Sequence, residues 1–257
     1  MQVMAKSGSL VVVASALLLA VWSRAGADVS ITACGQSVPA RQTGSLEADL
    51  VCPSSASSVF LDDRATLDLN NHTIAGATVV CLRSCTIMGP GEVGNTGSGG
   101  PFTDAILADS SGASARFVAQ DLTVRNSRSG IYSQARRSVF TNVTSTQNSE
   151  AGIVVYGSAK GTNVTVTDNG SAGFLSQRSK IKLTGLTATG NGAAGVLNNG
   201  GRTALIDSTV TGNTYPPFPG LPTDLDLFSF GRPKLVNTTC EHSLGPKGVP
   251  WGVCSLD

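Results

Sequence analysis

Basic side chains recur at one phase of a repeat in this chain, and they are the residues whose types and spacing could do chemistry. Six threonines mark this phase, and the residue seven positions before each is basic in five cases and Ser158 in the sixth. Lys160, two residues after Ser158, adds a charge to that coil. The candidate binding residues are Arg116, Arg137, Lys160, Lys180, Arg202 and Arg232. Evenly spaced guanidinium and ammonium groups suit the carboxylates of an acidic polysaccharide such as a polyuronate. That polysaccharide is therefore the predicted partner.

Two other interpretations of these cations stay open. Long side chains at a turn can splay into water and bind nothing. If the protein is an enzyme, Lys180 and Arg202 are the candidate catalytic residues of a β-elimination. One would neutralise the C5 carboxylate and the other would move the proton. The sequence does not decide whether any reaction occurs.

Carboxylates and histidines show no comparable order. Hydrolysis by two carboxylates needs both groups on one groove, and only Asp62 and Asp63 adjoin. A calcium site needs several converging oxygen ligands, whereas Asp104, Asp109 and Asp121 stand at different phases of the repeat. The two histidines lack paired ligands. We therefore expect no metal and no cofactor; Ca²⁺ stays open as an alternative that no ligand cluster in the sequence supports.

Composition places the chain near neutrality. It has 18 Lys and Arg residues against 17 Asp and Glu, a formal net charge of +1. Bulk charge therefore predicts no nucleic-acid binding. The basic positions are a local feature that the surrounding elements must bring together.

Those elements form a repeat of 21 or 22 residues. Threonine recurs at Thr123, Thr144, Thr165, Thr187 and Thr209. Asparagine recurs at Asn126, Asn148, Asn169, Asn191 and Asn213. Each repeat contains short runs in which apolar and polar residues alternate, the period of a half-buried strand. The repeat is too short for helix-pair units.

Three short strands per repeat predict an all-β fold: a single-stranded right-handed parallel β-helix of about eight coils. No coil can bury its apolar face alone, so the stack is the domain. The five asparagines are predicted to form a structural ladder, because a stacked amide can donate and accept along its column.

The pattern N-V-T-x-T-x-N-x-x-x-G-[IVF] resembles the right-handed β-helix repeats of the pectate-lyase-like superfamily, which includes NosD-type proteins and mannuronan C5-epimerase modules. The resemblance covers roughly residues 57–243. It implies the fold and no particular activity, because lyases, epimerases and inert scaffolds share that fold.

The first 27 residues are typical of a secretory signal peptide, with an apolar stretch that ends in Ala-Gly-Ala. Six cysteines follow, and proximity favours the disulfides Cys34–Cys52, Cys81–Cys85 and Cys240–Cys254. Free buried thiols are the alternative. We expect a secreted or periplasmic monomer with no membrane span once the signal is removed.

The expected organisation after the signal has three parts. Residues 28–56 form an N-terminal cap and residues 57–213 form the coils. Residues 214–257 hold an inserted proline-rich loop, the last coil and a C-terminal cap closed by a disulfide. A second glycine-rich loop is expected over residues 94–100.

Two further function classes compete with polysaccharide binding. Paired T-x-T columns on one face resemble those of ice-binding β-solenoids, although threonine is also simply common in exposed strands. A structural or surface-interaction protein without catalysis is the other alternative, and the missing carboxylate cluster favours it.

Overall fold

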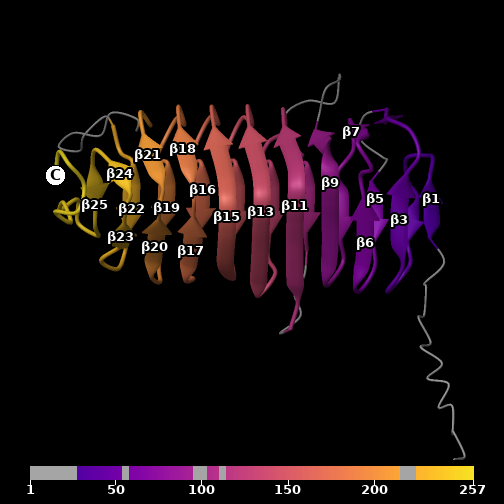
Figure 1. Ribbon diagram of the computed structural model, residues 1–257, viewed down its shortest axis with the longest axis horizontal. Coiled ribbons are helices and arrows are strands. Elements are labelled where there is room, and N and C mark those ends of the chain that lie inside the picture. Colours follow the sequence, from indigo (N-terminus) through magenta and orange to yellow (C-terminus); the bar gives the residue numbers. More distant parts are fainter. Residues whose placement is uncertain (1–27, 54–57, 95–102, 110–113, 215–223) are drawn as a thin grey trace, which may run out of the picture.

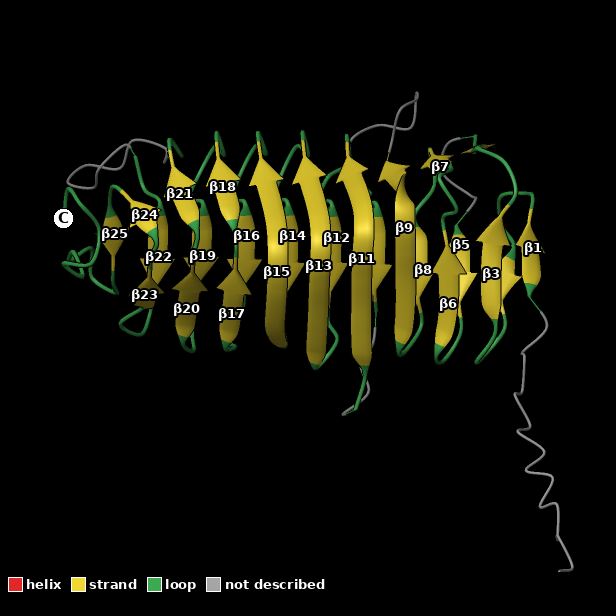
Figure 2. Ribbon diagram, in the orientation of Figure 1, coloured by secondary structure: helices red, strands yellow, loops and turns green. Residues whose placement is uncertain are grey.

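The computed structural model describes residues 28–53, 58–94, 103–109, 114–214 and 224–257. The predicted signal peptide and most of both predicted loops lie outside the described residues. Every regular element in the described part is a β-strand, and all strand pairs are parallel, as Figures 1 and 2 show. The prediction of an all-β parallel solenoid is therefore confirmed.

The larger sheet has fifteen strands, and its main path contains ten of them. That path is β1 (Val29–Ile31), β3 (Thr43–Leu46), β6 (Ala65–Asp68), β9 (Cys85–Gly94), β11 (Arg116–Arg125), β13 (Arg137–Thr146), β15 (Ser158–Thr167), β17 (Ile181–Thr184), β20 (Thr203–Ile206) and β23 (Lys234–Val236). The shorter strands are β4 (Leu50–Val51), β7 (Thr73–Ala75), β18 (Thr187–Thr189), β21 (Thr209–Thr211) and β24 (Thr239–Cys240).

The second sheet forms the opposite wall and has ten strands. They are β2 (Ser37–Val38), β5 (Val59–Leu61), β8 (Val79–Cys81), β10 (Ile106–Ala108), β12 (Ile131–Ser133), β14 (Ile153–Val155), β16 (Phe174–Ser176), β19 (Val196–Asn198), β22 (Leu227–Ser229) and β25 (Ser243–Leu244). Strands β1 to β4 pair into the same two sheets, so stacking already begins within residues 28–56.

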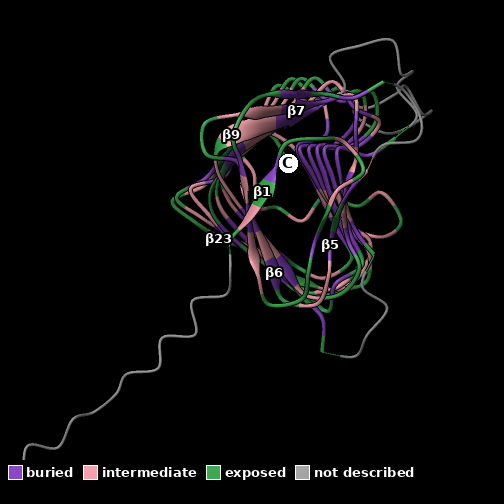
Figure 3. Ribbon diagram, turned by 90° about the vertical axis from the view of Figure 1, so that its right-hand side faces the viewer, coloured by how far each residue is buried: buried purple, intermediate pink, exposed green. Residues whose placement is uncertain are grey.

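Three of the four ten-residue strands of the larger sheet, β11, β13 and β15, bend in the middle at a residue with a left-handed backbone, which in β11 is Asp121. Asn142 in β13 has φ 51° and Asn163 in β15 has φ 53°. Asparagine and aspartate tolerate this conformation better than other residues with a side chain. The bend gives each coil a third face, so the sheets wrap a closed interior (Figure 3).

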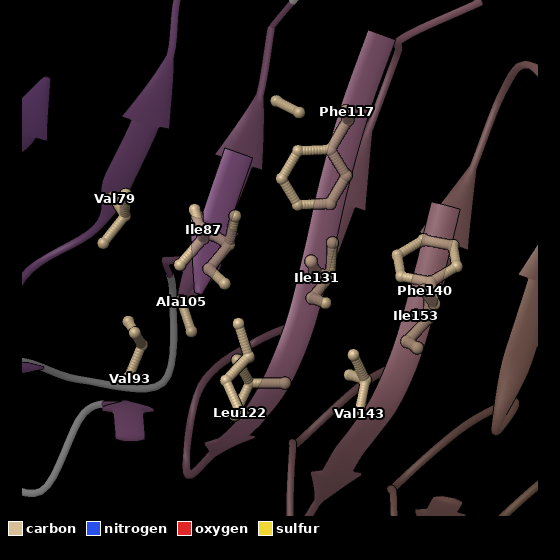
Figure 4. Packing of buried hydrophobic residues seen from close by; sticks show 14 of the residues in the cluster. Val79, Ile87, Val93, Ala105, Phe117, Leu122, Ile131, Phe140, Val143 and Ile153 are labelled. Carbon is tan, nitrogen blue, oxygen red and sulfur yellow. The ribbon is translucent and has the colours of Figure 1, made fainter. Parts of the chain in front are cut away.

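Alternating side chains fill that interior. Phe117, Phe140 and Phe174 are buried and stack edge to face from one coil to the next, with centroids 6.1 and 6.0 Å apart. Such geometry is the preferred one for aromatic pairs. Ile131 and Ile153 of the second sheet meet Phe117 and Phe140 from the opposite wall (Figure 4), whereas Phe174 belongs to β16 of that second sheet. The core runs the length of the stack.

An amide ladder inside one corner ties four coils together. Asn148 donates from Nδ2 to Oδ1 of Asn169 at 2.9 Å, and the same bond joins Asn169 to Asn191 at 2.9 Å and Asn191 to Asn213 at 2.8 Å. All four are buried, as a satisfied amide column allows. The ladder predicted from the sequence thus contains these four residues.

Asn126 does not belong to the ladder, so that part of the prediction is wrong. It lies in the turn with φ 55°, and the next residue, Ser127, stands at the ladder position. The backbone N–H of Ser127 donates to Oδ1 of Asn148 at 3.2 Å. Asn126 shares the phase of Gln147 and Asp168, the left-handed residues that come just before the ladder in the next two coils, so its amide lies one position before the column.

The three predicted disulfides are present. Cys34–Cys52 lies at the first coils, Cys81–Cys85 closes one turn, and Cys240–Cys254 holds the C-terminal segment on the last coil. The carboxylate of Asp257 strengthens that end by accepting hydrogen bonds from the N–H groups of Val253 and Cys254. The terminal strands, which lack a neighbour on one side, are thereby fastened.

Candidate basic binding edge

The predicted cations lie along one edge, where the long strands begin. Arg116 and Arg137 are the first residues of β11 and β13 and pair directly, and Arg137 pairs in turn with Ser158 at the start of β15. In Figure 1 this edge follows the lower ends of the arrows. Adjacent parallel strands stand about 4.8 Å apart, so the row carries one position per coil.

The row continues over the later coils. Lys180 and Arg202 directly precede Ile181 and Thr203, which pair with each other. Ala204 pairs with Lys234. Arg202 and Arg232 each stand two residues before one member of this pair, so they occupy the same position on neighbouring coils. Lys160 pairs with Lys182 on the neighbouring outward position. The basic edge, as we call the positions from Arg116 to Arg232, therefore places all six predicted binding residues together.

Three hollows open along the first half of the basic edge. The first, of about 690 Å³, is lined by Arg64, Arg83, Ser84 and Arg116 among others. The second, of about 480 Å³, lies between Arg116, Arg137 and Lys160. The third, of about 240 Å³, adjoins Arg116, Arg136 and Arg137. Arg116 borders all three, so it is the centre of the concave part.

The charge on this edge is not neutralised locally. In the described ranges none of the six predicted cations forms an ion pair, whereas Arg125 pairs with Glu92 at 2.6 Å. Arg128 likewise pairs with Asp104 at 3.0 Å, and that carboxylate raises the pKa of Arg128 further. The second hollow has three cations and no acidic residue in its lining. The edge therefore presents a positive potential to the solvent.

Sequence reasoning missed two arginines of the first hollow, Arg64 and Arg83. Both lie in turns that precede the threonine repeat, so counting back from a threonine could not find them. A usable signal exists for Arg64 only, because Arg83 lies one residue away from the phase that Arg64, Ser84 and Arg116 share. Arg64 directly precedes β6 and Ser84 directly precedes β9, the position that Arg116 occupies before Phe117.

A buried polar seam supports the turns of the basic edge. The hydroxyl groups of Ser133 and Ser138 lie 2.9 Å apart, and Ser179 donates to the carbonyl of Gly157 at 2.5 Å. Further along, Asn198 donates to Thr203 at 3.0 Å. These bonds satisfy polar groups where the chain leaves the second sheet. They hold the backbone from which the cations project.

The remaining ionisable groups form no second centre. Asp226 ends the amide ladder inside the stack, and burial there raises its pKa. The hydrogen bonds from Asn213 and from the N–H of Glu241 lower the pKa but do not outweigh burial. Burial also raises the pKa of Tyr132, which packs against Tyr156. Within the described ranges no three side chains of the metal-binding types come together.

The fold places the protein in a known class. The model of the right-handed β-helix region family matches residues 104–242, more than half of the chain. The chain therefore belongs to the right-handed β-helix family. Neither the curated proteins nor the solved structures contain a significant match to it.

Two findings bear on the compartment. The described cysteines are all paired in three disulfides, which persist in oxidising surroundings. No helix that is long and apolar enough to cross a membrane occurs in the described part of the chain.

Proposed function

We propose that this protein is secreted or periplasmic and binds an acidic polysaccharide along the basic edge. The observation that carries the proposal is the hollow between Arg116, Arg137 and Lys160, which has three cations and no acidic lining residue. Guanidinium groups form charge-assisted, often bidentate bonds with carboxylates. A polymer with regularly spaced carboxylates would meet one cation on nearly every coil.

A glycan array with matched variants tests this proposal. Arg116→Gln/Arg137→Gln removes two charges from the hollows, and Lys180→Ala/Arg202→Ala removes two from the open part of the row. Lys247→Asn serves as the control, because it removes a charge outside the row at a left-handed position that asparagine tolerates. We expect wild type and control to retain polyuronates and both double variants to lose retention. Equal retention by all four proteins would sink the proposal.

Salt dependence gives a second readout. Binding that rests on several exposed charge pairs weakens as ionic strength rises, because the Debye length falls from about 10 Å at 0.1 M to about 3 Å at 1 M. Wild-type retention should therefore fall steeply over this range. Retention that does not respond to salt would point to a different surface.

The proposal covers binding, and elimination at Lys180 and Arg202 is a separate matter. These two residues line none of the three hollows. Mass spectrometry after incubation with alginate, pectate and hyaluronan decides the question. An unsaturated product that disappears in the Lys180→Ala/Arg202→Ala variant would establish the reaction, and no product between pH 5 and 9 would exclude it for these substrates.

Ice binding is a second candidate, favoured by one specific observation. Thr144, Thr165, Thr187 and Thr209 pair in register, and Thr146, Thr167, Thr189 and Thr211 form a parallel column two residues later. The array is thus two threonines wide over four coils. Thermal hysteresis at millimolar protein is the measurement, and a zero value would remove this candidate.

A further inference from the structure

The largest of the three hollows combines three arginines with a carboxylate and apolar side chains around one space. Arg64, Arg83 and Arg116 line it, and Leu82 and Val118 add apolar surface. We call it the arginine cleft. The third hollow also has three arginines, but its volume is only about 240 Å³ and its lining has no carboxylate. The later coils of the row offer one or two cations each on an open surface, which suits an extended polymer. Three guanidinium groups around one hollow suit a single oxyanion.

The turn at residues 81–85 fixes the backbone of two of these arginines, Arg83 and Arg116. Arg83 lies in the turn that the Cys81–Cys85 disulfide closes, with Cα atoms 5.9 Å apart. The next residue, Ser84, accepts a hydrogen bond at its Oγ from the backbone N–H of Arg116 at 3.2 Å. The crosslink and this bond fix the two backbones relative to each other. A preorganised pair of this kind loses less entropy when it binds a ligand.

The arginine cleft also contains a carboxylate, which the neighbouring hollow lacks. Asp63 lines it with 37% of its side chain exposed, and it stands 3.9 Å from Arg64. A carboxylate repels a bare anion but accepts hydrogen bonds from hydroxyl groups. The cleft therefore suits a ligand that carries an oxyanion and hydroxyl groups on one small ring.

We propose that the arginine cleft is a subsite for one oxyanion-bearing sugar residue. Arg64, Arg83 and Arg116 bind its carboxylate or sulfate ester, Asp63 accepts from its ring hydroxyls, and Leu82 contacts an apolar face of the ring. The proposal takes its ligand class from the proposed function but does not require the long row, because one sugar fills the cleft. An attached chain would run from here along the basic edge.

Titration of small ligands into the full-length mature protein tests this subsite. The ligands are galacturonate, a 6-sulfated hexosamine, neutral galactose and inorganic sulfate. The variants are Arg83→Gln, Asp63→Asn and, as the control, Lys247→Asn, which removes a charge away from the basic edge. Amide NMR shifts report the affinity, and near-UV circular dichroism checks that each variant is folded.

We expect the wild type to bind at least one acidic sugar and to leave galactose unbound. Arg83→Gln should lower the affinity for the acidic sugar about tenfold or more, as the loss of one charge-assisted hydrogen bond implies. Lys247→Asn should leave that affinity unchanged. Asp63→Asn should lower the affinity for the acidic sugar, whereas inorganic sulfate should bind to this variant as well as to the wild type or better. Galacturonate against the 6-sulfated sugar shows which oxyanion is taken.

Several outcomes overturn the subsite. Inorganic sulfate binding with no preference for an acidic sugar would show a plain anion site. Equal losses in Arg83→Gln and Lys247→Asn would show diffuse attraction by the charge of the whole protein. Polymer retention without monosaccharide binding contradicts the subsite and leaves the proposed function intact. Monosaccharide binding without polymer retention contradicts the proposed function and leaves the subsite.

Discussion

The substitution Asn169→Asp tests whether the amide ladder holds the stack together. Asn169 donates from Nδ2 to Oδ1 of Asn191 at 2.9 Å and to the carbonyl of Ser145 at 3.1 Å. Its own Oδ1 accepts from Asn148 at 2.9 Å. Aspartate keeps the shape of the side chain and the acceptor oxygen. It replaces the NH₂ group, which donates two hydrogen bonds, with a second oxygen that faces the same two acceptors. The ladder is thereby broken at one point.

The expected loss follows from the protonation that the buried carboxyl must undergo. Neutralising an ordinary aspartate at pH 7 costs about 3 pKa units, or about 4 kcal/mol, which limits the electrostatic penalty. The protonated acid supplies only one of the two lost donations, and the unmade bond adds about 1 kcal/mol. We therefore expect the free energy of unfolding to fall by about 3–5 kcal/mol at pH 7, a large share of a typical domain's stability.

Asn163→Asp is the matched control, because it is the same chemical change on the surface. Asn163 lies six residues earlier in the same coil and donates to Oδ1 of Asn142 at 3.0 Å in an exposed position. Aspartate also tolerates its left-handed backbone. The control should therefore lose no more than about 1 kcal/mol.

Urea unfolding of both variants with disulfides intact, followed by near- and far-UV circular dichroism, gives the measurement. Burial raises the pKa of the new carboxyl in the folded state, so its penalty is full above that folded pKa. The penalty shrinks as the pH falls towards the unfolded value of about 4. Asn169→Asp should therefore recover stability between pH 7 and pH 4. Equal losses in the two variants, or no recovery in acid, would refute the reasoning.

Three other predictions concern stability. Phe140→Ala removes the middle ring of the buried stack and should lower the free energy of unfolding by about 3–5 kcal/mol in the same assay. Because burial raises the pKa of Asp226, the wild type loses stability as the pH rises from the unfolded value of about 4 through the folded one, and Asp226→Asn should abolish this part of the pH dependence. Burial also acts on Asp257, but hydrogen bonds from Cys254 and Ser243 outweigh it and lower its pKa. The stability it supplies is present above pH 4 and lost in more acidic solution, so Asp257→Asn should flatten the acid limb of the stability curve.

The sequence predicted the fold and the row for the same physical reason. Coils of constant length put residues 21 or 22 apart side by side, so a periodic pattern becomes a spatial column. Arg116, Arg137 and Ser158 are paired because β11, β13 and β15 keep one register over ten residues each. Periodicity alone was enough to find this.

The error at Asn126 shows where periodicity fails. Thr123 is followed by asparagine after three residues, but Thr144 and Thr165 are followed by asparagine after four. A one-residue difference at a turn exchanges the inside for the outside of the coil, as it does in any strand. The difference was visible in the sequence, and its consequence depended on turn geometry.

The arginine cleft could not be predicted in the same way, because turns of unequal length create it. Arg83 projects from a short turn after β8, whereas the chain between β10 and β11 is longer, and Ser114 of that segment lines the same hollow. Side chains that meet between unequal turns share no period. Their proximity is a property of the folded chain alone.

The six predicted cations of the basic edge carry a cost that ion pairing relieves at some other cations of the described chain. Like charges on adjacent strands repel, and each directly opposed pair is destabilising by a few tenths of a kcal/mol or more. The protein pairs other exposed cations, as at Arg125 with Glu92 and at Arg128 with Asp104. Solvation of long side chains offsets part of the repulsion, but it does not explain why the cations recur on successive coils or why hollows open beside them. A bound polyanion would remove the repulsion and gain charge-assisted hydrogen bonds together, so the arrangement that costs stability in the free protein is the one that favours the complex.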